Sequence, residues 1–230
     1  SLCAARAGKD MYCEKPCSMT VDESIALAET MNRYKVVYQA GTQRRSVPNF
    51  MFAKDLCDQN KLGKLTEVHA NTLHPATGHD WLPGQKEPSK EEVDWDLWLG
   101  PCPVRPYNGM YVSGRWRGHY DFHGGGILEW GAHTVDLCNW AGTNDKKMPV
   151  RYEPTADGCV ATYDDGLKMV MREQGWLGLG TCGVRYIGEE GWVETADSGR
   201  MEFSSSELRS QQQEFTMTGT SANTHVRNFL

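Results

Sequence analysis

The feature that most constrains the fold is a strand–helix–strand pattern near the start of the chain. Thr20-Val21-Asp22-Glu23 forms a capping box, in which Thr20 accepts from the amide of Glu23 and Glu23 reaches back, so a helix is predicted at 21–33. Short apolar runs at 10–13 and 36–40 flank this helix and predict buried strands. Two strands joined across a helix in one sheet run parallel, so this segment predicts part of an α/β sheet.

In the rest of the chain, the pattern of apolar residues changes at Pro149. Before that proline, the pattern predicts helices after Pro48 and at 126–141, a strand at 65–73, a long loop at 74–92 and a short helical turn at 94–101. After it, apolar residues alternate, and Asp165-Gly166 predicts a hairpin between strands at 158–163 and 167–173. Further strands at 181–187, 192–195 and 200–203 complete a predicted, mainly antiparallel meander.

Both ends of the sequence have the pattern of interrupted helices. Residues 2–8 are typical of a helix's last turns, closed by Gly8, and residues 225–230 are typical of the first turns of another. We therefore expect this sequence to be a fragment.

Composition excludes several classes of protein. Lys and Arg total 24 against 30 Asp and Glu, a net charge of −6 without a long basic run, which disfavours nucleic-acid and acidic-membrane partners. No stretch approaches the roughly 18–20 apolar residues of a membrane span. The 8 cysteines contain no Cys-x-x-Cys pair, so we expect reduced thiols and a reducing compartment.

Glu14-Lys15-Pro16 lies just past the end of the first predicted strand, where open α/β sheets bind ligands. Proline fixes the backbone there, and the ammonium of Lys15 could stabilise a developing alkoxide. The alternative is an ordinary surface pair of Lys15 and Glu14 near a turn.

A second candidate group lies on the helix predicted at 126–141. Glu129, His133 and Asp136 are spaced four and three residues apart, so they share one side of that helix. A carboxylate and an imidazole that converge could act as orienter and general base. The alternative is a partly buried histidine with helix-surface acids.

Other candidates are weaker. Gln43-Arg44-Arg45 follows the second strand and could clamp an anion or cofactor, or be ordinary solvated cations. Trp81 and Trp116 occur in loops and could flank a sugar, although most tryptophans are core or interface residues. Five further histidines are considered as metal ligands: His69, His74, His79, His119 and His123. His119 and His123 would align on a helix, but the adjoining glycines argue against a helix there, so we predict no metal site.

Together these segments resemble the Gfo/Idh/MocA family of NAD(P)-dependent oxidoreductases. Glu14-Lys15-Pro16 matches its E-K-P signature, Gln43-Arg44-Arg45 resembles the turn after the next strand, and Gly124–Asp136 is similar to its G-G-x-x-x-D-x-G-x-H-x-x-D segment. Residues 225–230 resemble a late helix that packs on the cofactor domain. Glu129 stands where the family usually has Asp.

The resemblance implies an α/β plus α+β architecture. Residues 1–46 would be the C-terminal part of a dinucleotide-binding Rossmann domain, whose glycine-rich turn lies upstream. Residues 47–230 would be the substrate and oligomerisation domain, with a large, mainly antiparallel sheet.

The resemblance also assigns roles. Lys15, His133 and Glu129 would be catalytic; Glu14, Lys15, Pro16 and Arg44 would bind NAD or NADP; and Gln43, Trp116 and Asp136 would bind substrate. It implies hydride transfer to or from a sugar, inositol or related polyol, in a cytoplasmic homo-oligomer associated through the sheet. Two alternatives are an NAD-dependent glycoside hydrolase and a catalytically decayed binding protein, for which Glu129 is the one hint.

Overall fold

The computed structural model describes residues 1–78, 80–212 and 223–230. The chain divides into two compact units, one formed by residues 1–72 with 130–230 and the other by residues 73–129. The predicted boundary after residue 46 falls inside the first unit, and each unit is described by itself below.

The first unit begins with the strand–helix–strand pattern that the sequence predicts. Helix α1 (Leu2–Arg6) precedes β1 (Met11–Glu14), α2 (Val21–Tyr34) and β2 (Tyr38–Gly41). β1 and β2 pair in parallel, and both hydrogen bonds of the capping box are present, which confirms these two predictions. Leu27 and Met31 of α2 pack on Ala5 of α1, whereas Val21 and Ile25 of the same helix are exposed.

A helix from the end of the chain packs against β2. In α8 (Asn223–Phe229), Nε2 of His225 donates to the Ala40 carbonyl at 2.9 Å, and Nδ1 of the same ring lies 2.8 Å from the Ser46 hydroxyl. Gln39 donates to the backbone carbonyl of His225 at 2.7 Å. These contacts confirm the predicted return of the late helix to the parallel strands.

The first unit also holds a seven-stranded sheet of order β4-β5-β6-β3-β7-β8-β9. Its strands are β3 (Leu65–Asn71), β4 (Arg151–Thr155), β5 (Gly158–Thr162), β6 (Lys168–Arg172), β7 (Val184–Gly188), β8 (Trp192–Thr195) and β9 (Met201–Phe203). The predicted β5–β6 hairpin is present, and all pairs are antiparallel except β3–β6.

The prediction of a simple meander is wrong, because β3 inserts between β6 and β7. β3 alternates Val68 and Ala70, which are fully buried, with Glu67 and His69 on the other face. Its buried residues continue the apolar row of Met169 on β6. β3 therefore has a paired strand along each of its edges. The local periodicity of a strand does not reveal which neighbours it pairs with.

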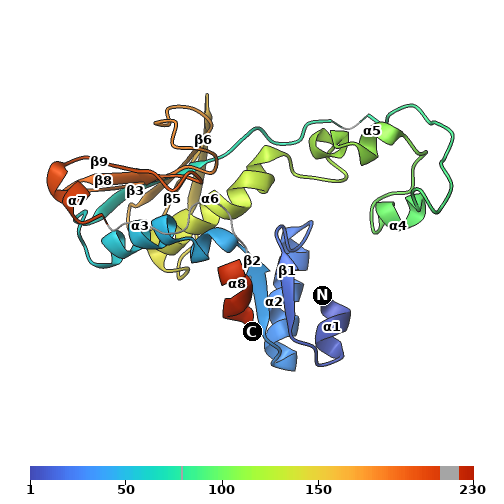
Figure 1. The fold of residues 1–230 in the computed structure, drawn as a ribbon, viewed down its shortest axis with the longest axis horizontal. Helices are drawn as coiled ribbons and strands as arrows, with labels where there is room; N and C mark the ends of the chain where they lie inside the picture. The colour runs from blue at the N-terminus through green and yellow to red at the C-terminus, as the bar shows by residue number, and fades with distance from the viewer. Residues whose placement is uncertain (79, 213–222) are drawn as a thin grey trace. The chain divides into compact units, whose positions relative to one another are not determined.

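Two helices cover one face of this sheet, α3 (Pro48–Asp58) and α6 (Gly126–Thr143) (Figure 1). Phe50, Leu56 and Leu137 pack there against Val68 and Tyr186 of the strands. Complete burial of each such aliphatic or aromatic side chain contributes about 1.5–3 kcal/mol. The 3-10 turn η1 (Gln43–Ser46) precedes α3, and α7 (Ser206–Ser210) follows β9.

The second unit, residues 73–129, has its own aromatic core. Trp95 and Leu99 of α4 (Trp95–Leu99) pack with Tyr111 of α5 (Gly109–Val112), and η2 (Arg115–Gly118) follows. The fully buried Arg105 side chain pairs with Asp121 at 2.6 Å and lies 4.9 Å from the Trp81 ring. The unit therefore combines short helices with one buried, compensated charge.

None of the described helices combines the length and the apolar character needed to span a membrane.

Candidate functional site

The carboxyl ends of β1 and β2 hold Glu14 in a fixed position. Glu14 pairs in register with Gly41, where an added Cβ would fall 2.6 Å from a Glu14 carboxylate oxygen. Gln43, in the turn after β2, donates to both carboxylate oxygens of Glu14 at 2.9 and 2.7 Å, and lies 3.3 Å from the Tyr12 hydroxyl. Gly41 thus leaves the space in which Glu14 and Gln43 meet, as the sequence predicts for the shared sheet edge.

Helix α6 positions His133 at the end of β3. The neighbouring Thr134 donates from its hydroxyl to the Asn71 carbonyl at 2.8 Å, which fastens the helix to the last residue of that strand. The His133 side chain is only 6% exposed, and its Nδ1 atom is buried without a hydrogen-bond partner among the described residues. A buried, unpaired ring nitrogen can accept a proton or a hydrogen bond from a bound molecule.

His133 is neutral at ordinary pH. Burial, together with the charges of Arg44 and Lys15, lowers the pKa of His133 to about 3, against a smaller opposing effect of Asp197. An imidazole in this state can act as a base.

Lys15 belongs to the same electrostatic group as His133. The positive charge of Lys15 lowers the pKa of His133 on α6. It also opposes, together with Arg44, the rise that burial causes in the pKa of the Cys182 thiol. The ammonium of Lys15 therefore affects the pKa of two buried groups, His133 and Cys182, from distant parts of the sequence. That Lys15 and His133 form a common catalytic site stays a prediction.

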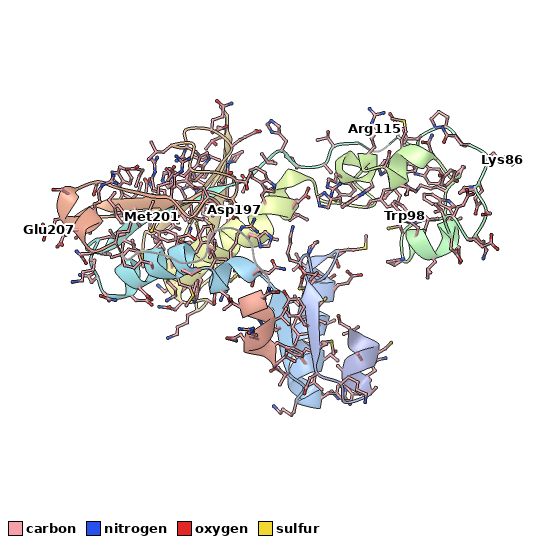
Figure 2. All side chains as sticks on the ribbon, in the orientation of Figure 1. Lys86, Trp98, Arg115, Asp197, Met201 and Glu207 are labelled. Atoms are coloured by element: carbon pink, nitrogen blue, oxygen red, sulfur yellow. The ribbon has the colours of Figure 1, made fainter. Side chains whose placement is uncertain are left out.

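Arg44 is engaged by an acid that the sequence analysis did not single out. Its guanidinium forms two hydrogen bonds to Asp197, at 2.8 and 2.6 Å, and Asp197 also accepts from the Thr181 hydroxyl at 2.7 Å. Asp197, labelled in Figure 2, follows β8 and lies 153 residues from Arg44. Local spacing carries no signal for a partnership this distant. The cofactor contact predicted for Arg44 stays a prediction.

Asp136 points its carboxylate at a different cation. Arg45 forms paired hydrogen bonds to Asp136 at 2.7 and 2.6 Å, and the same guanidinium also binds Asp145. Burial raises the pKa of Asp136, although the Arg45 guanidinium opposes the rise. The structure therefore places Asp136 in an ion-pair network, and its predicted contact with substrate is not part of the geometry described for His133 and Lys15.

Glu129 and Trp116 fall in the second unit, so their position relative to His133 is not described. Within that unit, Glu129 lies 3.2 Å from the Arg117 guanidinium, which also covers the Trp116 ring at 4.4 Å. Trp116 also meets the His123 ring edge to face at 5.0 Å. Their catalytic and substrate-binding roles stay predictions.

No cluster of three or more histidines, cysteines or acids suited to a metal ion occurs within residues 1–78, 80–212 and 223–230. His79, one of the histidines considered above, lies outside the described residues. A cavity of about 510 Å³ lies at the ends of α3 and α6, lined by Cys57, Lys64 and Asn144 among others. It contains none of the predicted site residues.

Comparison with known proteins gives one family match. Residues 60–174, half of the chain, match the C-terminal alpha/beta domain of the oxidoreductase family of Gfo/Idh/MocA type. The rhizopine catabolism protein MocA of Rhizobium meliloti is 39% identical over 194 residues, covering 83% of this chain and 50% of that protein. Inositol 2-dehydrogenase 3 of Saccharopolyspora erythraea is 31% identical over 102 residues, 43% of this chain and 30% of that protein. The chain thus spans half or less of the length of these relatives.

Solved structures share the fold at low identity. An inositol dehydrogenase homologue from Azotobacter vinelandii, complexed with NAD+, superposes with a TM-score of 0.61 and 15% identity, covering 88% of this chain and 50% of that one. The WlbA dehydrogenase from Chromobacterium violaceum, in complex with NADH and UDP-GlcNAcA, gives a TM-score of 0.56 and 15% identity, covering 99% of this chain and 58% of that one. At such identities the likeness shows the fold alone.

Proposed function

We propose, from the premise that this chain belongs to the Gfo/Idh/MocA oxidoreductase family, that the protein transfers a hydride between NAD or NADP and a secondary hydroxyl of a sugar, inositol or related polyol. The observation that carries the proposal is the buried, neutral His133 with its unpaired Nδ1, held within the field of Lys15. The names of the relatives support a polyol substrate, and the NAD+ and NADH complexes among the structural neighbours support NAD.

The residues present fit the nicotinamide end of such a cofactor. Glu14 and Lys15 stand at the carboxyl end of a parallel strand pair, the edge at which open α/β sheets hold ligands. The orphaned nitrogen of His133 provides one polar atom that still needs a partner. Glu14, Lys15 and Pro16 would hold the cofactor there, and the bound cofactor supplies the hydride acceptor.

His133 and Lys15 divide the acid–base work on the substrate hydroxyl. The neutral imidazole of His133 takes the hydroxyl proton as the C–H bond breaks, which general-base catalysis requires. The ammonium of Lys15 binds the same oxygen and stabilises the negative charge that develops on it. The reverse reaction uses the same groups with the proton returning from His133 to the oxygen.

The experiment that tests this proposal measures formation of reduced cofactor by the full-length protein with a panel of inositols, sugars and acyclic polyols. We expect turnover with at least one polyol and NAD+ or NADP+, and a loss of about a hundredfold or more in kcat for His133→Asn. His69→Gln is the matched control, because the His69 side chain is also largely covered but lies on β3, paired with Glu67. Turnover that is equal in both variants would overturn the role of His133.

The face of the sheet opposite α3 and α6 is the surface we propose for self-association. Arg185 and Glu194 pair there across β7 and β8, while His69 on β3 contacts Arg172 on β6 at 3.0 Å. The Glu194 side chain is buried and also accepts from the Leu177 amide at 2.7 Å, so its charge is compensated within the chain, and the proposal of self-association rests on the resemblance to the family. Light scattering of the full-length protein should give a dimer or larger assembly; a monomer at micromolar concentration would contradict it.

A further inference from the structure

Two cysteines bracket the segment that carries Lys15. Cys13 is the third residue of β1, Cys17 follows Pro16, and only Glu14, Lys15 and Pro16 separate them. Both sulfur atoms approach the backbone carbonyl of Glu14, Cys13 at 3.6 Å and Cys17 at 3.8 Å. Cys17 also approaches the carbonyl of Cys13 at 3.7 Å. The loop therefore folds back so that its two ends present their thiols to the same backbone atoms.

The two thiols also interact directly with one another. Cys13 and Cys17 are close enough for each thiol to influence the pKa of the other, and the Ser1 hydroxyl donates to the Cys13 sulfur at 3.7 Å. Cys13 pairs in register with Ala40 of β2, which fixes the start of the loop to the parallel strand pair. The shared approach of both sulfurs to the Glu14 carbonyl thus places the two thiols near one another at the Lys15 loop.

The environments of the two thiols differ in a way that suits redox chemistry. Burial raises the pKa of the Cys13 thiol, but polar groups around the sulfur, among them the Ser1 hydroxyl that donates to it, outweigh burial and lower its pKa overall. Burial raises the pKa of Cys17. A thiol of lowered pKa beside a second thiol is the usual arrangement of an oxidisable pair. In contrast, burial raises the pKa of Cys57 and Cys138, which leaves those thiols inert.

We propose that Cys13 and Cys17 are a redox modification site, at which a peroxide forms a reversible disulfide that closes a ring around Glu14-Lys15-Pro16. The Cys13 thiolate attacks one peroxide oxygen, so that an S–O bond forms, the O–O bond breaks and hydroxide leaves. The Cys17 sulfur then attacks the Cys13 sulfur, the S–S bond forms and the S–O bond breaks. In sum two thiols and one hydrogen peroxide give one disulfide and two waters, and two electrons pass from sulfur to oxygen.

The disulfide changes the position of Lys15. A disulfide requires the sulfurs to approach to about 2.05 Å with a fixed dihedral angle, far closer than a hydrogen bond between thiols. Because three residues close the ring, their backbone must move with the sulfurs, and Lys15 is the middle one. The bond itself does not depend on the proposed function, whereas its effect on turnover does.

The bond is tested by treating the full-length protein with one equivalent of hydrogen peroxide and mapping its peptides without reduction. We expect a Cys13–Cys17 linkage, about 2 Da lighter than the dithiol, which dithiothreitol reverses. Cys13→Ser and Cys17→Ser should both prevent it. Cys3→Ser is the matched control, because Cys3 is an exposed thiol on the neighbouring α1, and this variant should still form the linkage. Oxidation at other cysteines with Cys13 and Cys17 left as thiols would overturn the proposal.

The effect on Lys15 is followed in two ways. Turnover should fall at least tenfold on oxidation and return with dithiothreitol, whereas Cys13→Ser and Cys17→Ser should keep a constant turnover under peroxide. Acetylation of Lys15 by acetic anhydride should also change in rate several-fold on oxidation, and this readout needs no activity. A linked protein with unchanged turnover and unchanged acetylation would refute the movement of Lys15. Absent turnover in the reduced protein, with the acetylation change present, would count against the proposed function alone.

Discussion

At the scale of single residues, the charge state of His133 decides what the site can do. Its imidazole is surrounded by protein on nearly all sides, with the cations Arg44 and Lys15 near enough to oppose protonation. A proton on this ring would therefore be both poorly solvated and repelled. The ring stays neutral until a substrate hydroxyl delivers its proton, at the step where the oxygen's negative charge meets Lys15.

The same shift predicts how stability depends on pH. The pKa of His133 is about 3 in the folded protein and about 6.5 in the unfolded chain. Below pH 6.5 the unfolded state binds a proton that the folded state does not, so the stability contributed by the neutral ring is lost as pH falls. We expect the free energy of unfolding to fall more steeply between pH 6.5 and 4 in the wild type than in His133→Asn. Parallel urea-denaturation profiles of the two proteins would contradict this.

Removal of the Lys15 charge should move the pH profile of turnover. Lys15 lowers the pKa of His133, so Lys15→Met should raise that pKa and shift the acid limb of kcat/KM to higher pH. It should also lower kcat by about a hundredfold, because the developing alkoxide loses its partner. Lys9→Met is the control, as Lys9 is an exposed lysine close in sequence. An acid limb at the same pH in Lys15→Met and wild type would show that the two groups do not interact.

At the scale of elements, ion pairs tie the turn after β2 to distant segments. Two arginines of η1 form these ion pairs: Arg44 with Asp197 after β8, and Arg45 with Asp136 on α6. In addition, His225 of α8 donates a hydrogen bond to the carbonyl of Ala40 near the end of β2. These links make the parallel pair and the large sheet parts of one unit, with Lys15 and His133 on it together.

The Arg44–Asp197 pair gives a stability prediction at this scale. Both side chains are largely buried, so Arg44→Met leaves Asp197 uncompensated and should lower the free energy of unfolding by about 3 kcal/mol. The double variant Arg44→Met, Asp197→Leu should recover most of that loss. Arg151→Met is the control, since its pair with Glu153 is exposed and should cost less than about 0.5 kcal/mol. Equal losses for Arg44→Met and the double variant would contradict a compensated pair.

Elements governed by local chemistry were predictable from the sequence. Thr20 and Glu23 define the start of α2, and Asp165-Gly166 defines the β5–β6 turn, because each signal lies within a few residues. The position of β3 between β6 and β7 was not predictable, since it depends on pairing across about a hundred residues. Lys15 and His133 were identified from local motifs and from the family resemblance. Asp197 and Thr181 were not identified, because Asp197 pairs with Arg44 across 153 residues of sequence.

At the scale of the whole molecule, the first unit gathers the site from distant parts of the chain. Lys15 follows β1, Arg44 lies after β2, His133 lies on α6, and Asp197 follows β8. The parallel pair and the large sheet each supply part of the group, so neither alone would contain it. The account therefore depends on Lys15 and His133 acting on one bound molecule.

The most direct measurement of that claim is a double-mutant cycle on kcat/KM with Lys15→Met, His133→Asn and the double variant of the full-length protein. Groups that act on the same oxygen are not additive, so the double variant should lose far less than the product of the two single losses. The account predicts a coupling of at least tenfold between the two positions. Losses that multiply, with no coupling, would contradict a shared site for Lys15 and His133.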